Sequence, residues 1–79
     1  MNTPDPQPSR VETVISAVLY LMTAYQRTRC PRIAACVAAH LDCLAEHPHA
    51  DPTIRELCAG MREEWRGTAA AALPRQNVH

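Results

Sequence analysis

The chain has 79 residues and a formal net charge of zero, with eight acidic residues against eight basic ones, all of them arginine. A chain of this length forms one small domain, and a neutral chain has no overall electrostatic attraction to nucleic acid or to an anionic membrane. Two glycines are too few for a glycine-rich phosphate-binding loop, and no P-loop or dinucleotide-binding motif is present.

The N-terminal segment, residues 1–8, contains three of the seven prolines and no apolar run. It predicts a disordered polar tail and lacks the features of a secretory signal peptide. The most apolar stretch, Val14–Tyr25, is shorter than the roughly 20 residues needed to cross a bilayer. We therefore expect a cytoplasmic protein without membrane contact, in which the four cysteines are free thiols.

A first helix is predicted at about residues 9–28. Ser9 and Glu12 have the spacing of a capping box at a helix N-terminus. The residue before Pro31 is disfavoured in a helix, which places the end of this one near Thr28. Apolar residues at intervals of three and four indicate an amphipathic helix, and they are Val11, Val14, Ile15, Val18, Leu21, Met22 and Tyr25.

A second helix is predicted at about residues 31–47, and a third at about 51–67. Pro31 suits the first position of a helix, and Asp51 followed by Pro52 is an N-cap followed by proline. Gly67 is a candidate C-terminal residue, although the alanines after it could extend the third helix. The expected core side chains are Ile33, Val37, Leu41, Leu44, Ile54, Leu57, Cys58, Met61 and Trp65.

Short connections between three helices predict an all-α fold, a small antiparallel three-helix bundle in residues 9–73, with a frayed C-terminal tail at 74–79. Bundles of this size often gain stability by self-association. Leu19 and Tyr20 lie outside the main apolar stripe of the first helix. A homodimer through that helix is therefore one of two outcomes that we consider, beside a monomer with isolated surface apolar residues.

Cysteine and histidine alternate along the second helix. Cys36, His40, Cys43 and His47 follow the spacing i, i+4, i+7, i+11 and share one stripe. This stripe is roughly 16 Å long, so one Zn²⁺ or Cu⁺ ion would need a ligand from elsewhere, such as Cys58. The candidate metal ligands are thus Cys36, His40, Cys43 and Cys58. Because no Cys-x-x-Cys pair is present, we favour ordinary packing or solvated residues, and expect no cofactor.

Positive charge is concentrated at the turn between the first two helices, where Arg27, Arg29 and Arg32 could receive an acidic group of a partner. The third helix could be read as the recognition helix of a helix-turn-helix. Its first six residues include two acidic ones, Asp51 and Glu56, where phosphate contacts would be needed. This argues against DNA binding.

No catalytic motif is present, and a bundle this small offers little room for a substrate. The favoured prediction is a non-enzymatic, cytoplasmic helical protein–protein interaction module, a small regulator or adaptor. A metal-binding or thiol-responsive protein is the alternative, and a DNA-binding helical regulator is the third. The predicted partner-binding residues are Leu19, Tyr20, Arg27, Arg29 and Arg32.

Overall fold

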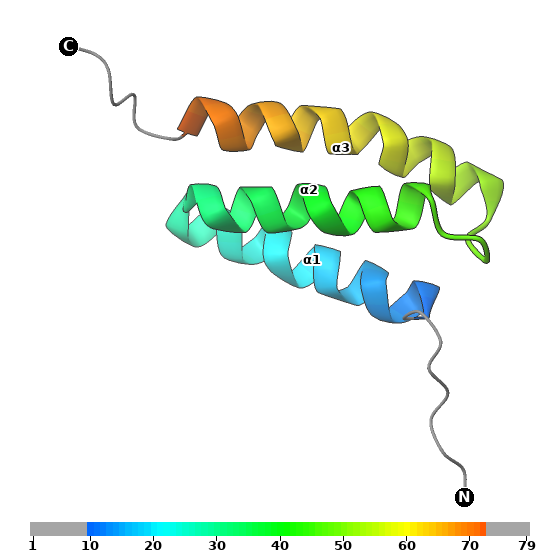
Figure 1. Ribbon diagram of the computed structural model, residues 1–79. Coiled ribbons are helices and arrows are strands. Elements are labelled where there is room, and N and C mark those ends of the chain that lie inside the picture. Colours follow the sequence, from blue (N-terminus) through cyan, green and yellow to red (C-terminus); the bar gives the residue numbers. More distant parts are fainter. Residues whose placement is uncertain (1–9, 73–79) are drawn as a thin grey trace, which may run out of the picture.

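The computed structural model describes residues 10–72. They form three α-helices (Figure 1), namely α1 (Val11–Thr28), α2 (Pro31–Ala45) and α3 (Pro52–Ala72). The predicted all-α, three-helix architecture is confirmed. The predicted tails, 1–8 and 74–79, lie outside the described residues, as do Ser9 and Leu73.

The first helix begins two residues later than predicted. Its N-cap is Arg10, which is extended and makes no side-chain capping hydrogen bond. Glu12 therefore lies in the first turn, where a carboxylate interacts favourably with the helix dipole. The Ser9 half of the predicted capping box falls outside the described residues.

The turn between α1 and α2 is tight. Arg29 adopts the left-handed conformation, with φ 55°, and its N–H donates to the carbonyl of Tyr25 at 2.7 Å. This geometry ends a helix and is usually taken by glycine, so an arginine here is uncommon. Cys30 then caps α2 in an extended conformation, and Pro31 occupies the first turn as predicted.

The second helix ends at Ala45, two residues before the predicted end. Pro48 disfavours helical geometry at His47, so the chain leaves the helix there. His47 lies in the following turn and is only 4% exposed. Its Nδ1 accepts a hydrogen bond from the backbone N–H of His49 at 3.1 Å. The prediction that His47 continues the cysteine and histidine stripe of α2 is therefore wrong.

The third helix begins as predicted and ends later. The Asp51 carboxylate accepts a hydrogen bond from the N–H of Thr53 at 3.0 Å, which makes Asp51 the N-cap. The predicted end at Gly67 is wrong. This glycine does not take a positive φ, and α3 continues through a run of alanines, strong helix formers, to Ala72.

The central helix is α2, which lies between α1 and α3 (Figure 1). Both neighbours pack on α2, whereas no described Cα atom of α1 comes within 8 Å of one in α3. The buried side chains of the main core are Val14, Val18, Val37, Leu41, Leu44 and Cys58. Within residues 10–72, no helix combines the length and apolar character that spanning a bilayer requires.

Charged side chains bridge α2 and α3. Arg62 of α3 pairs with Asp42 at 2.5 Å and with Glu46 at 3.4 Å, both on α2. Partial burial lowers the pKa of the Arg62 guanidinium, but the hydrogen bonds and charges of Glu46 and Asp42 outweigh that effect and raise it. No such pair joins α1 to either neighbour within the described residues.

Candidate functional site

An apolar groove runs between α1 and α3, and we call it the α1–α3 groove. It encloses a hollow of about 160 Å³. Each of the three helices contributes to its walls, and all the lining residues are apolar: Ile15, Val18, Leu19, Met22, Leu41, Leu44, Ile54, Leu57, Cys58 and Met61. Leu41 and Leu44 belong to the buried core, so the bottom of the groove is formed by α2.

The groove stays open because the backbones of α1 and α3 both lie close to α2, whereas no described Cα atom of α1 comes within 8 Å of one in α3. Leu19 on α1 is 60% exposed, and Leu57 on α3 is 57% exposed. Single exposed leucines are ordinary on a protein surface. Here, however, the two lie on opposite walls of one apolar depression, and a contiguous apolar patch of that kind is typical of a binding surface.

One end of the groove is closed by aromatic side chains. The rings of Tyr25 on α1 and Trp65 on α3 meet edge to face, with centroids 5.3 Å apart. The guanidinium of Arg29 lies 5.8 Å from the centroid of the Tyr25 ring, which is within the range of a cation–π contact. These three residues line a second hollow, and Met22 borders both this hollow and the groove.

The predicted partner-binding residues do not form one surface. Leu19 lines the α1–α3 groove and Arg29 lies at its aromatic end. Tyr20, 68% exposed, is turned about 100° from Leu19 around the helix and does not line the groove. Arg27 and Arg32 are exposed, and neither lines a hollow described above or has an ion-pair partner among residues 10–72.

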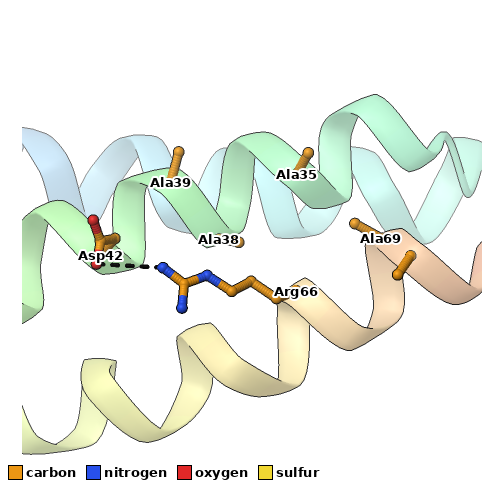
Figure 2. Close-up of a pocket in the computed structure, with 7 residues that line it drawn as sticks. Ala35, Ala38, Ala39, Asp42, Arg66 and Ala69 are labelled. Atoms are coloured by element: carbon orange, nitrogen blue, oxygen red, sulfur yellow. Dashed lines mark ion pairs between the residues drawn. The ribbon is translucent and has the colours of Figure 1, made fainter.

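A larger hollow, of about 500 Å³, lies between α2 and α3 (Figure 2). Its walls are alanine methyl groups, with Arg66 and Asp42 beside them. These two charges already pair with each other at 3.6 Å, and Arg66 also pairs with Glu63 at 2.7 Å. Since neither charge is left for a ligand, we interpret this hollow as the outer edge of the α2–α3 contact.

The candidate metal ligands are not gathered into one site. Cys36 and Cys43 are exposed on α2, whereas Cys58 is buried in the core, where burial raises the pKa of its thiol. The His40 ring interacts within its own helix, because its Nδ1 lies 2.7 Å from the carbonyl oxygen of Cys36. Among residues 10–72, no three His, Cys, Asp or Glu side chains lie close enough together to hold a metal ion.

Two features of the surface were missed by reasoning from the sequence. Leu57 was assigned to the core, but it is exposed because α1 does not reach across to cover it. The charged contact between α2 and α3 had a usable signal, because Asp42 and Glu46 are four residues apart, as are Arg62 and Arg66. Equal spacing of opposite charges on neighbouring antiparallel helices allows them to pair.

Comparison with known proteins provides no functional guide. No model of a protein family matches the chain, and neither does any curated protein or solved structure.

Proposed function

We propose that this chain is a small, non-enzymatic protein–protein interaction module, a cytoplasmic regulator or adaptor, that binds an amphipathic helix in the α1–α3 groove. The observation that carries this proposal is the exposure of Leu19 and Leu57 on opposite walls of an entirely apolar groove. Burying such side chains against a partner is favourable because it removes apolar surface from water.

The dimensions of the groove favour a helix as the bound element. Its α1 wall runs from Ile15 to Met22 and its α3 wall from Ile54 to Met61. Seven residues of helix rise about 10 Å, or two turns. A docked helix presents apolar anchors at i, i+3 or i+4 and i+7, which cover the same two turns. The metal-binding and DNA-binding alternatives have no comparable observation among residues 10–72.

Site-specific photo-crosslinking tests this proposal. A benzophenone amino acid at position 57, in the groove, is compared with the same amino acid at position 20, where an exposed tyrosine lies outside it. We expect protein adducts from position 57 in cells, far fewer from position 20, and loss of the former when Leu19→Glu is added. Circular dichroism confirms that each variant folds.

The adducts are identified by mass spectrometry, and either another protein or a second copy of the chain supports the proposed function. Equal labelling from both positions, or no protein adduct from position 57, would show that the groove is not a docking surface.

A further inference from the structure

The α1–α3 groove carries a pattern that matches α1 itself, and the inference drawn from it rests on the proposed function. We propose that the occupant of the groove is a second copy of this chain, with the two α1 helices antiparallel about a twofold axis. In such a pair each copy buries its own Leu19 in the groove of the other.

The groove-facing stripe of α1 continues beyond the groove. Ile15, Leu19 and Met22 line it directly, and Gln26 lines the adjoining hollow. Glu12 is exposed and lies three residues before Ile15 and seven before Leu19, which places it on the same side of the helix. These positions alternate at intervals of three and four residues, the spacing of a seam between two packed helices.

One antiparallel register aligns both the apolar and the charged positions of this stripe. A twofold axis level with the peptide bond between Tyr20 and Leu21 places Leu19 opposite Met22 of the second copy. The same axis places Ile15 opposite Gln26, and Glu12 opposite Arg29. By symmetry each of these contacts occurs twice.

The charges at the ends of α1 favour this orientation. Glu12 and Arg29 are separated by roughly 25 Å along the helix, and neither has an ion-pair partner among residues 10–72. Antiparallel pairing brings each Glu12 to an Arg29, whereas parallel pairing would place like charges together. A helix face with opposite charges at its two ends is complementary to a second copy of itself related by a twofold axis. An unrelated partner would need its own opposite charges at the same spacing.

The size of this interface predicts a weak dimer. An 18-residue helix is about 27 Å long, and a footprint two helices wide covers roughly 500 Å² of each copy. That is near the lower limit for specific protein interfaces. We therefore expect a dissociation constant in the micromolar range and reversible exchange of copies.

Sedimentation equilibrium of matched variants tests the surface. Leu19→Glu should raise the dimer dissociation constant by about 100-fold, because two charges become buried in apolar grooves. Tyr20→Glu introduces the same charge at the neighbouring position, which is also exposed but lies outside the groove, and should leave the constant within about threefold of the wild type. A chain that is monomeric at millimolar concentration, or a dimer insensitive to Leu19→Glu, would overturn the inference.

Charge exchange tests the register. Glu12→Arg alone should raise the dimer dissociation constant by about tenfold, since the new arginine at position 12 of each copy then faces Arg29 of the other. Adding Arg29→Glu should restore most of the affinity, and isotope-filtered NMR should show contacts between the Leu19 and Met22 methyl groups of different copies. No recovery in the double variant, or intermolecular contacts without that pair, would overturn the antiparallel register.

Failure of this inference can be separated from failure of the proposed function. If the chain is monomeric and position 57 crosslinks to a different protein in a Leu19-dependent way, the groove is a docking surface for another occupant. If position 57 captures nothing and the chain is also monomeric, both proposals fail.

Discussion

The two sides of α2 bind their neighbours by different means. Towards α3, alanines and core side chains such as Cys58 make apolar contact, and Arg62 also connects the helices through Asp42 and Glu46. Towards α1, contact depends on apolar side chains, and no ion pair crosses it within the described residues. The α3 side is held by ion pairs as well as by apolar contacts, while the α1 side continues into an open groove.

This contrast shows where surface remains available for binding. Side chains that pair within the chain have their charge neutralised, so they offer little to a partner. Exposed apolar side chains have no such internal compensation and gain free energy when they are covered.

Truncation of Leu41, a core side chain of α2, should cause the greatest loss of stability. Leu41 is 1% exposed and forms part of the bottom of the groove, so Leu41→Ala should lower the free energy of unfolding by about 3 kcal/mol, from lost apolar contact and the cavity left behind. Urea denaturation measures this loss. Leu57→Ala, on the exposed wall of the same groove, should cost less than about 1 kcal/mol. Equal losses would mean that the groove is closed in solution.

Removal of the charge at Arg62 should weaken the contact between α2 and α3 without affecting the contact between α1 and α2. Arg62→Gln should lower the melting temperature, because Asp42 and Glu46 lose their common partner. The decrease should be smaller than that of Leu41→Ala, because partly exposed ion pairs contribute little to stability. The difference from the wild type should shrink as salt is added, since salt screens these charges. Arg32→Gln is the control, because Arg32 is exposed and has no ion pair among residues 10–72. A salt-independent effect would assign the role of Arg62 to packing.

Two glycines in α3 should be replaceable with a gain in stability. A methyl group added at Gly60 or Gly67 would meet nothing within 4 Å, and neither residue has a positive φ. Each substitution by alanine should therefore raise the free energy of unfolding by about 0.5–1 kcal/mol, through helix propensity and a less flexible unfolded chain. Thermal denaturation followed by circular dichroism measures the gain. A loss at Gly60 would reveal a close contact there, such as a bound helix in a dimer.

The buried thiol should give the smallest effect, visible only at alkaline pH. Burial raises the pKa of Cys58, so the folded chain holds this proton more firmly than the unfolded chain does. Its contribution to stability is complete at neutral pH and is lost as the pH rises past the pKa of the unfolded thiol. The wild type should lose more stability than Cys58→Ala over that range. Parallel pH profiles would contradict the burial of this thiol.

Sequence reasoning predicted the elements well where local signals determine them. Pro31 and the Asp51–Pro52 pair identified the starts of α2 and α3, because capping and proline geometry act over a few residues. The ends were less predictable. Gly67 lies inside α3, although a glycine often follows the last residue of a helix. The helix continues here because the residues that follow are alanines.

The site was only half predictable, for a reason of tertiary geometry. The sequence singled out Leu19, which lies beyond the width of stripe that two neighbouring helices would cover. It could not reveal that Leu57 lies opposite, because the apolar stripe of α3 has the same appearance whether or not α1 closes over it. Tyr20 was grouped with Leu19 because both lie outside the main apolar stripe, although consecutive residues on a helix face different directions.

The central position of α2 also has a consequence for folding. Close backbone approach occurs only between helices that are consecutive in the chain, α1 with α2 and α2 with α3. Each contact requires the closure of one short loop, so the entropic cost of the search is low and folding should be fast. Each helical hairpin is therefore local enough in sequence to form before the remaining helix docks.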